Sequence, residues 1–475
     1  MQVFNRTKIV ATIGPASSSK EVLRDLINAG VDVCRLNFSH GAYDDHAKVV
    51  STIHELNVEL DTHVAILVDL QGPKLRIGEV EENTVLEEGK EIEFTTEKCI
   101  GNASKVYITY QEFPQDVKKG ERIMVDDGKL LLEIISTDGV KKVIARVVQG
   151  GQLSSKKGVN LPNTAISLPC LTEKDLSDLK FALEQNVQWI GLSFVRSATD
   201  IIELKHLIRQ QGEKSPRIIA KIEKPEAISD IDDIIKEADG LMVARGDLGV
   251  EIPMQNVPLL QKMIVKKCLQ ASKPVIIATQ MMESMISCST PTRAEVSDVA
   301  NAVMDGTDAV MLSGETSVGK FPVRVVETMQ KIITVIENDE DIYYKHFLSC
   351  SKDPRRYISD HICSNACTMA QQVNAKAIIT LTHSGYTALM LSSKRPKAPI
   401  FVFTDNRSLV SKLSLVWGIR GFYYNRQIST DHTIDDIKYM LKKKGYINEG
   451  DLVIFIASVP MTEKGKTNML KLSHA

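Results

Sequence analysis

The segment IIAKIEKPEAISDIDDIIKEADGLMVARGDLGVE, residues 218–251, decides the fold that we expect for this chain. It has the pattern of a strand, a helix and a second strand. The first apolar run ends in KIE (221–223), Pro225 opens an amphipathic helix that should end near residue 238, and the second apolar run ends in RGD (245–247). Two consecutive buried strands therefore end in charged residues.

These two strand ends predict a metal site. If the strands are parallel neighbours, Glu223 and Asp247 lie roughly 5 Å apart. That spacing suits two carboxylates that share a hard divalent cation, Mg²⁺ above all, completed by water and substrate oxygens. Lys221 emerges on the same strand face as Glu223, which suggests chemistry on an anionic substrate. A structural Lys–Glu pair at a strand end is the alternative.

Composition excludes several classes of partner. The 475 residues carry a net charge of −2, with 43% hydrophobic and 25% charged residues, and predict two to four domains. This balance gives no basic surface for a nucleic acid or an anionic membrane. No apolar run approaches the roughly 18 residues of a membrane span, and no signal-peptide core opens the chain. Eight cysteines without a CxxC pair favour a reducing, cytoplasmic location over a zinc ribbon.

Strand-like runs alternate with helical runs through most of the chain. We expect eight strands, which end near residues 14, 37, 69, 195, 223, 247, 279 and 313. They predict a parallel (β/α)8 barrel, the fold of triosephosphate isomerase, formed by residues 1–70 and 169–340. A doubly wound open sheet is the competing architecture, because both folds place functional residues at the carboxyl ends of strands.

Two further segments have residue patterns that differ from those of the predicted barrel. Residues 71–168 hold short runs rich in β-branched residues with glycine turns, which predict a small antiparallel β domain, a β-barrel lid able to close over the barrel mouth. Residues 341–475 predict a smaller C-terminal α/β domain. Its first strand leads into THSGYT (382–387), which is either an anion site at a helix start or a plain helix cap.

The other predicted barrel strands also end in polar residues. Arg35, Asn37 and Ser39 should share one strand face, where an arginine binds phosphate or carboxylate in a bidentate manner and the neutral oxygens suit a monovalent cation. Asp69, Thr279 and SGET (313–316) close further strands. Each has a structural alternative, such as a helix cap or a salt bridge. A barrel, however, would bring all of them to one rim.

Together these motifs resemble the pyruvate kinase family. The matching stretches are ATIGPAS (11–17), RLNFSHG (35–41), LVDLQGPKLR (67–76), SKKGVNLP (155–162), AKIEKPEA (220–227), MVARGDLGVEIP (242–253), ATQMMESM (278–285) and MLSGET (311–316). The resemblance covers essentially the whole chain. It implies a barrel, an inserted lid and a C-terminal domain. It also implies the last step of glycolysis, in which phosphoenolpyruvate and ADP give pyruvate and ATP with Mg²⁺ or Mn²⁺.

The resemblance also implies roles for individual residues. Glu223 and Asp247 correspond to the Mg²⁺ ligands, and Lys221 to the residue that stabilises the transferring phosphoryl group and the enolate. Thr279 corresponds to the hydroxyl near the carbon that is protonated. The implied proton-relay residues are Ser313 and Glu315.

Binding residues follow from the same resemblance. The backbone at Arg245, Gly246 and Asp247 would hold the substrate carboxylate, and Arg35 would contact the substrate phosphate. The implied nucleotide-binding residues are Asn37, Phe38, Ser39, His40, Arg76 and Lys157. Arg76 is also an implied catalytic residue.

One position departs from the pattern of potassium-requiring members, which usually carry Thr and Glu where this chain has Leu70 and Lys74. In those members a monovalent cation lies among residues that match Asn37, Ser39, Asp69 and the carbonyl of Leu70. We hypothesise that Lys74 replaces this cation, so that activity needs Mg²⁺ but little K⁺.

The resemblance further implies regulation and assembly. The loop Thr382, His383, Ser384, Gly385, Tyr386 and Thr387 corresponds to the place where many family members bind a phosphorylated allosteric effector. Members are usually homotetramers.

Two rival interpretations remain. Another barrel enzyme of Mg²⁺-enolates, such as a pyruvate-dependent aldolase or a phosphoenolpyruvate mutase, would share Glu223 and Asp247 but would not require the lid motif. A protein that kept the fold and lost turnover is the second, and the intact Lys221 and Thr279 argue against it.

Overall fold

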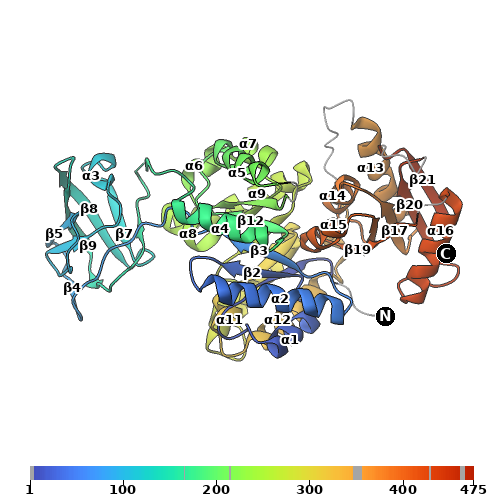
Figure 1. Ribbon diagram of the computed structural model, residues 1–475, viewed down its shortest axis with the longest axis horizontal. Coiled ribbons are helices and arrows are strands. Elements are labelled where there is room, and N and C mark those ends of the chain that lie inside the picture. Colours follow the sequence, from blue (N-terminus) through green and yellow to red (C-terminus); the bar gives the residue numbers. More distant parts are fainter. Residues whose placement is uncertain (1–4, 165, 213–214, 346–355, 427–428, 460–465) are drawn as a thin grey trace.

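Three parts follow one another along the long axis of the molecule: a β-rich lid on the left, a barrel in the middle and a C-terminal α/β part on the right (Figure 1). This computed structural model describes residues 5–164, 166–212, 215–345, 356–426, 429–459 and 466–475. The chain leaves the barrel after β3, builds the lid, and returns to complete the barrel before it enters the C-terminal part.

Eight parallel strands close the barrel in the order β1, β16, β15, β14, β13, β12, β3, β2. The (β/α)8 prediction is therefore confirmed, and the open doubly wound sheet is wrong. The strands are β1 (Lys8–Thr12), β2 (Val33–Asn37), β3 (Ala65–Asp69), β12 (Trp189–Leu192), β13 (Arg217–Ile222), β14 (Gly240–Ala244), β15 (Val275–Ala278) and β16 (Ala309–Leu312).

Several strands end one to three residues earlier than predicted, because the residues that follow adopt conformations no strand accommodates. Phe194 and Thr279 have φ angles of 54° and 68°, in the left-handed region that bulky and β-branched residues avoid. Arg245, predicted at a strand end, instead begins a helix. The carboxyl ends of the strands thus turn sharply into the loops of the rim.

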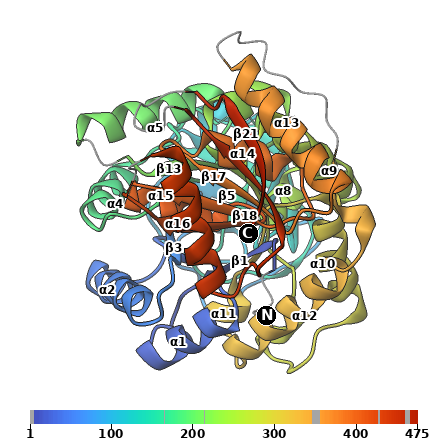
Figure 2. The same ribbon diagram turned by 90° about the vertical axis from the view of Figure 1, so that its right-hand side faces the viewer.

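Helices surround the barrel, and Figure 2 shows α1, α2, α4, α5, α9, α10 and α12 arranged as a ring. The helices of this part are α1 (Lys20–Ala29), α2 (Tyr43–Glu59), α4 (Glu173–Glu184), α5 (Ala198–Gln210), α6 (Pro225–Ser229), α7 (Ile231–Glu237), α8 (Arg245–Glu251), α9 (Val257–Ala271), α10 (Arg293–Asp305), α11 (Gly314–Ser317) and α12 (Pro322–Ile336), with 3₁₀ turns η1 (Met254–Asn256), η2 (Glu283–Ile286) and η3 (Glu340–Ile342). No helix among the described residues is long and apolar enough to cross a membrane.

The single helix predicted from Pro225 to near residue 238 is wrong, because the chain forms two helices, α6 and α7. They meet at Asp230, whose backbone departs from helical geometry with φ −102° and ψ 15°. The Asp230 carboxylate accepts a hydrogen bond of 2.7 Å from the Ala198 N–H at the start of α5. This contact with the neighbouring helix fixes the break.

The lid has its own six-stranded sheet in the order β11-β7-β8-β9-β5-β6, beside a two-stranded sheet of β10 and β4. Its elements are β4 (Val85–Leu86), β5 (Glu91–Thr95), β6 (Lys105–Tyr107), α3 (Phe113–Asp116), β7 (Arg122–Val125), β8 (Leu130–Thr137), β9 (Lys142–Gln149), β10 (Gly151–Gln152) and β11 (Val159–Asn160). Isolated bridges from Arg76 to Gly158 and from Ile77 to Ile108 join the two edges of the larger sheet. The sheet therefore curls toward a barrel, as expected.

The expectation of a fully antiparallel lid is wrong at one pair of strands. β5 and β6 run parallel, with Glu93 opposite Lys105, because residues 96–104 cross over instead of turning back as a hairpin. An ion pair of 3.0 Å joins the two side chains of this register. A separate apolar core, which includes Phe94, Val106 and Phe113, fills the lid, so that the lid is a packed unit of its own.

The C-terminal part is a five-stranded sheet in the order β19-β18-β17-β20-β21, in which only β21 runs antiparallel to its neighbour. Its elements are α13 (Tyr357–Gln372), β17 (Ala377–Leu381), α14 (Tyr386–Ser393), β18 (Ile400–Thr404), α15 (Arg407–Lys412), η4 (Leu413–Leu415), β19 (Ile419–Tyr423), α16 (Thr430–Lys443), β20 (Leu452–Ala457) and β21 (Met469–His474).

Both tryptophans of the chain lie where the barrel meets the C-terminal part. The Trp189 indole of β12 donates a hydrogen bond of 3.2 Å to the Lys412 carbonyl at the end of α15. The backbone N–H of Trp417 donates to the Asp308 carboxylate at 3.1 Å, and the same carboxyl group pairs with the buried Arg395 at 2.9 Å. Apolar packing and buried polar contacts thus join the two parts.

Candidate active site

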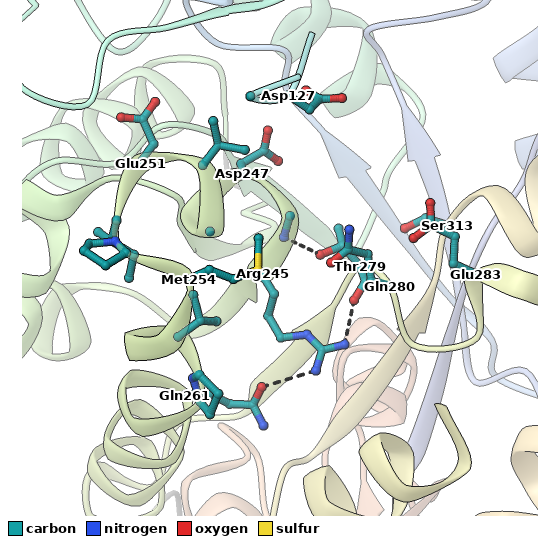
Figure 3. Close-up of a pocket in the computed structure, with 18 of the residues that line it drawn as sticks. Asp127, Arg245, Asp247, Glu251, Met254, Gln261, Thr279, Gln280, Glu283 and Ser313 are labelled. Atoms are coloured by element: carbon teal, nitrogen blue, oxygen red, sulfur yellow. Dashed lines mark hydrogen bonds between the residues drawn. The ribbon is translucent and has the colours of Figure 1, made fainter. Parts of the chain in front are cut away.

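A cavity of about 1280 Å³ lies between the barrel rim and the lid. The barrel contributes Arg245, Asp247, Thr279 and Ser313, all at carboxyl ends of strands, while the lid contributes Asp127. Figure 3 shows these labelled side chains around one hollow, with α8 on one side and the residues after β15 on the other. The barrel therefore brings several of the predicted residues together.

Three neighbouring side chains hold Lys221 at the rim. Its ammonium lies 2.8 Å from Glu223 Oε1 and 3.3 Å from Asp69 Oδ2, and it donates to Ser193 Oγ at 2.7 Å. These contacts fix all three of its N–H directions within one buried cluster. A lysine in such a cluster is a rigid positive charge.

The same contacts determine the charge of Lys221. Burial favours the neutral amine, but the carboxylates of Asp69 and Glu223 outweigh burial and hold the pKa of Lys221 above its ordinary value. Burial alone would raise the pKa of Asp69, yet Arg35 and Lys221 outweigh it and hold that pKa below its ordinary value. Lys221 is thus a cation and Asp69 an anion at neutral pH.

Arg35 completes this cluster from β2. Its Nε and Nη2 both donate to Asp69 Oδ2, at 2.9 and 2.6 Å, and its Nη1 donates to Thr12 Oγ1 at 3.0 Å. Arg35 was predicted to contact phosphate, and here its guanidinium is engaged by Asp69. The second oxygen, Asp69 Oδ1, is buried without a hydrogen-bond partner.

Glu223 and Asp247, the predicted cation ligands, lie close enough for the charge of Asp247 to act on Glu223. Burial raises the pKa of Glu223 in spite of Lys221, and the nearby negative charge of Asp247 raises it further. Two hard oxygen donors that repel each other fit a divalent cation. Among the described residues no three His, Cys, Asp or Glu side chains are arranged to hold a metal ion, so a cation here would take its remaining ligands from substrate and water.

Thr279 stands on strained backbone at the end of β15. Its positive φ is unusual for a β-branched residue, and the surrounding bonds maintain it. Thr279 Oγ1 accepts from the Gly246 N–H at 2.7 Å and donates to the Ala278 carbonyl at 2.6 Å. Arg245 Nη2 donates to the Thr279 carbonyl at 2.7 Å (Figure 3).

The Arg245 guanidinium is bonded to protein groups in this structure and holds α8 against its neighbours. Its Nη1 forms an ion pair of 2.7 Å with Asp298 on α10 and reaches Gln261 on α9 at 3.5 Å. The first turn of α8 is thereby tied to two outer helices and to Thr279. The Gly246 N–H, which the resemblance assigned to the substrate carboxylate, is bonded to Thr279 in this structure.

Ser313 and Glu315 line the same cavity. The buried Glu315 carboxylate accepts from the backbone N–H groups of Ser313 at 2.7 Å and Met282 at 3.2 Å. Burial raises the pKa of Glu315. This carboxylate fastens the loop after β15 to the loop after β16, the two loops that carry Thr279 and Ser313.

The predicted nucleotide residues are spread over the rim and the lid. Phe38 is buried and packs against the rings of His46 and Phe181, at centroid distances of 4.6 and 5.8 Å, whereas His40 is exposed. In the lid, Arg76 donates to the Lys156 carbonyl at 3.0 Å.

Lys157, the other predicted lid residue, forms an ion pair of 2.9 Å with Asp126. In the part of the chain that the structure describes, no hydrogen bond or ion pair joins Arg76 or Lys157 to the barrel rim.

The predicted monovalent-cation residues are partly engaged by protein groups. Asn37 Oδ1 accepts from the Ser39 N–H at 3.1 Å, and the Leu70 carbonyl accepts from Ser193 Oγ at 2.7 Å. Lys74 is exposed and lines the cavity with Asp127 and Asp247. Within the described ranges, no hydrogen bond or ion pair joins Lys74 to the candidate cation ligands.

The predicted effector loop, residues 382–387, precedes α14, and Gly385 supplies the φ of 84° that the turn requires. His383 Nδ1 lies 2.8 Å from the Asp405 carboxylate, and the Tyr386 hydroxyl donates to Asp360 at 2.6 Å. Both carboxylates would repel a phosphate group. An anionic ligand at this loop would have to displace them.

Sequence reasoning missed Ser193, which holds Lys221 and the Leu70 carbonyl together. A signal was present, because Ser193 follows β12 at the carboxyl end of a barrel strand, the same position that drew attention to Thr279 and Ser313. It was overlooked because the run WIGLSFV (189–195) reads as one continuous apolar strand.

Comparison with known proteins gives consistent matches over the whole chain. A model of the pyruvate kinase barrel domain matches residues 4–326, and a model of the pyruvate kinase alpha/beta domain matches residues 360–473. A pyruvate kinase from Geobacillus stearothermophilus is 42% identical over 470 residues, covering 98% of this chain and 80% of the relative.

Two further matches cover nearly complete chains. A pyruvate kinase from Clostridium acetobutylicum is 42% identical over 473 residues, 99% of each chain. The crystal structure of a pyruvate kinase from Cryptosporidium parvum superposes with a TM-score of 0.92 at 34% identity, covering 99% of this chain and 96% of that chain.

Replacing Asp69 with asparagine is expected to destabilise the protein strongly. Arg35 and Lys221 would remain buried without their shared anion, and breaking a buried pair costs about 3–5 kcal/mol. Since the folded-state pKa of Asp69 is lowered, its stabilisation is complete above the ordinary carboxyl pKa and is lost as the pH falls through the folded value. The difference in thermal midpoint between wild type and Asp69→Asn should therefore be large at pH 7 and shrink on acidification.

Glu97→Gln is the control for this change. The Glu97–Lys141 pair in the lid is exposed, and solvent screens such a surface pair so that it contributes little to stability. Equal midpoints for the two variants would contradict the assignment of Asp69 as a central anion.

Replacing Gly191 with alanine is expected to disturb the same cluster sterically. Gly191 lies opposite Asp69 on neighbouring strands, and an added methyl group would overlap Asp69 Oδ1. Asp69 cannot withdraw without loosening Arg35 and Lys221, so we expect a loss of about 1–3 kcal/mol, typical of overpacking, measured as a lower thermal midpoint. Gly158→Ala is the control, because its methyl group would approach no atom closer than 3.7 Å; an unchanged midpoint for Gly191→Ala would mean that the rim has room to yield.

Proposed function

The chain belongs to the pyruvate kinase family of phosphotransferases, and from that premise we propose that it transfers the phosphoryl group of phosphoenolpyruvate to ADP. The bond from phosphorus to the enol oxygen breaks, a bond to a β-phosphate oxygen of ADP forms, and the enolate takes up a proton at carbon to become pyruvate. The observation that carries the proposal is the position of the Lys221 ammonium between the carboxylates of Asp69 and Glu223 at the barrel mouth.

Lys221 has the charge and rigidity that phosphoryl transfer requires. Catalysis of this reaction depends mainly on positioning and on neutralising charge on the transferring group and the leaving oxygen. Because Asp69, Glu223 and Ser193 already orient its ammonium, little reorganisation is needed when the charge on the substrate shifts. Arg35 lies beside Lys221 on the same Asp69 oxygen and adds positive charge for the substrate phosphate.

Glu223 and Asp247 would hold Mg²⁺ or Mn²⁺, which when bound supplies positive charge to the substrate oxygens. Burial raises the pKa of Glu223, and the negative charge of Asp247 raises it further, so a cation bound between the two carboxylates would relieve an unfavourable charge. Glu223 directly follows β13 and Asp247 lies in the first turn of α8, directly after β14, so the two carboxylates extend from the ends of adjacent strands.

Thr279 is the group that we assign to the protonation side of the substrate. In this structure its hydroxyl proton points to the Ala278 carbonyl and its oxygen accepts from Gly246. A substrate carboxylate that binds at the first turn of α8, near Arg245, Gly246 and Asp247, would compete for the Gly246 N–H and release Thr279 Oγ1. Ser313 and Glu315, in the adjoining loop, would then relay the proton.

The lid supplies Arg76 and Lys157 for the nucleotide, together with Asn37, Phe38, Ser39 and His40 of the barrel rim. Both lid cations bond to lid groups here, so closure of the lid is the step that would bring them to the phosphates of ADP. A homotetramer, a phosphorylated effector at residues 382–387 and a cytoplasmic location stay predictions.

The direct test is product formation. Full-length protein with phosphoenolpyruvate, ADP and Mg²⁺ should release pyruvate and ATP in equal amounts, and chelation of the divalent cation should stop both. Lys221→Met should lower turnover at least about 10²-fold, the effect typical of removing one preorganised electrostatic group.

Lys180→Met, at an exposed position on α4, is the matched control and should leave turnover unchanged. Pyruvate without ATP would favour an aldolase-type or mutase-type enzyme. An inactive wild type that still binds both substrates would favour a protein that has lost turnover.

The role of Lys74 is tested by measuring how the initial rate depends on the monovalent cation in the buffer. If its ammonium substitutes for K⁺, initial rates in tetramethylammonium buffer should lie within about twofold of those in potassium buffer, while Lys74→Glu should make the rate depend on K⁺. Since Lys74 is exposed in this structure, the substitution requires its flexible chain to swing toward Asn37 and Ser39. Strong activation of the wild type by K⁺ would refute the hypothesis.

A further inference from the structure

A buried ion pair lies behind the two acidic residues of the proposed cation site. Lys224 Nζ is 2.7 Å from Glu251 Oε1, and both side chains are almost completely inaccessible to solvent. Lys224 directly follows Glu223 in the chain. Glu251 lies four residues after Asp247 on α8, so both project from one face of that helix.

The pair therefore joins the two segments that carry the cation-binding carboxylates. α8 has seven residues, too few for its own backbone bonds to fix its orientation. Glu251 anchors the carboxyl end of α8 to the segment after β13, while Arg245 anchors the other end through Asp298. The position of Asp247, between these two anchors, depends on both.

A third group reaches the same oxygen from the lid. Asn160 Nδ2, on β11, donates to Glu251 Oε1 at 2.8 Å. Asn160, Lys224 and Asp247 also line one small cavity of about 30 Å³ together with Lys74. Glu251 Oε1 is thus an acceptor at which the lid and both segments that carry the proposed cation ligands meet.

Lys224 also contacts Phe194, in the loop after β12, which in turn binds Glu223. Its ammonium lies 6.0 Å from the centre of the Phe194 ring, and the Phe194 N–H donates to Glu223 Oε2 at 2.7 Å. Phe194 has a positive φ of 54°, a conformation that persists only where its surroundings maintain it. Lys224 packs against the residue that orients Glu223.

We propose that Lys224, Glu251 and Asn160 are positioning residues that hold Glu223 and Asp247 at the separation a divalent cation needs. This inference rests on the proposed function only in taking Glu223 and Asp247 as the cation ligands. Because burying an ion pair is expensive and often gives no net stability, we assign this pair to positioning the two segments rather than to stabilising the fold. Its loss should weaken cation binding beyond any effect on folding.

The test measures binding of Mn²⁺ to the full-length protein by electron paramagnetic resonance of the free ion, without nucleotide, alongside the thermal midpoint. Lys224→Met and Glu251→Gln are each expected to raise the Mn²⁺ dissociation constant at least fivefold. Asn160→Leu should raise it at least twofold, because Glu251 Oε1 then loses one of its two donors. Glu237→Gln, which breaks the Lys205 pair on the outer helices, should leave it unchanged.

A double variant separates positioning from folding. Lys224→Met combined with Glu251→Leu removes both charges at similar volume, so no unpaired charge is left buried and the thermal midpoint should lie close to that of wild type. The Mn²⁺ dissociation constant should still be at least fivefold higher than that of wild type. Recovery of wild-type Mn²⁺ binding in the double variant would overturn the proposal and make the pair merely structural.

The cation site itself is checked by Glu223→Gln. If that change leaves Mn²⁺ binding intact, the proposed ligands are wrong. The positioning proposal fails in a different way. In that case Glu223→Gln weakens Mn²⁺ binding, but the Lys224 and Glu251 variants bind Mn²⁺ as tightly as wild type.

Discussion

The structure depends on one cluster of opposite charges inside the carboxyl end of the barrel. Asp69 stands between Arg35 and Lys221, and Lys221 in turn reaches Glu223. None of these groups would be stable there alone, because an unpaired buried charge costs several kcal/mol. The closed barrel supplies the partners from three strands, and the cluster in turn fixes the rim on which the loops are built.

Much of this arrangement could be predicted from the sequence. Alternating apolar and amphipathic runs predict the barrel, and charged or hydroxylated strand ends predict its functional rim, because parallel strands end together. The contact between Lys221 and Asp69 could not be predicted in this way, since β12 lies between β13 and β3. It forms because Gly191 leaves room across β12 and Ser193 bridges the gap, and both facts depend on the register of a closed sheet.

Other details depend on contacts that no local pattern contains. The break at Asp230 needs the N–H of a neighbouring helix, the parallel pairing of β5 with β6 needs a crossover in the lid, and the left-handed Thr279 needs Gly246 and Arg245. In each case tertiary bonds override the preference of the local sequence. The placement of Glu315 between two loops is of the same kind, because its partners are backbone groups.

The positions of the two indole rings decide what an optical signal from this protein would report. Trp189 and Trp417 both lie at the junction of the barrel with the C-terminal part, and the lid contains neither. Intrinsic fluorescence excited at the red edge of protein absorption is therefore sensitive to separation or repacking of that junction and largely blind to movement of the lid. A probe of lid motion would have to be introduced by adding a chromophore there, and the native emission would then serve as an internal reference.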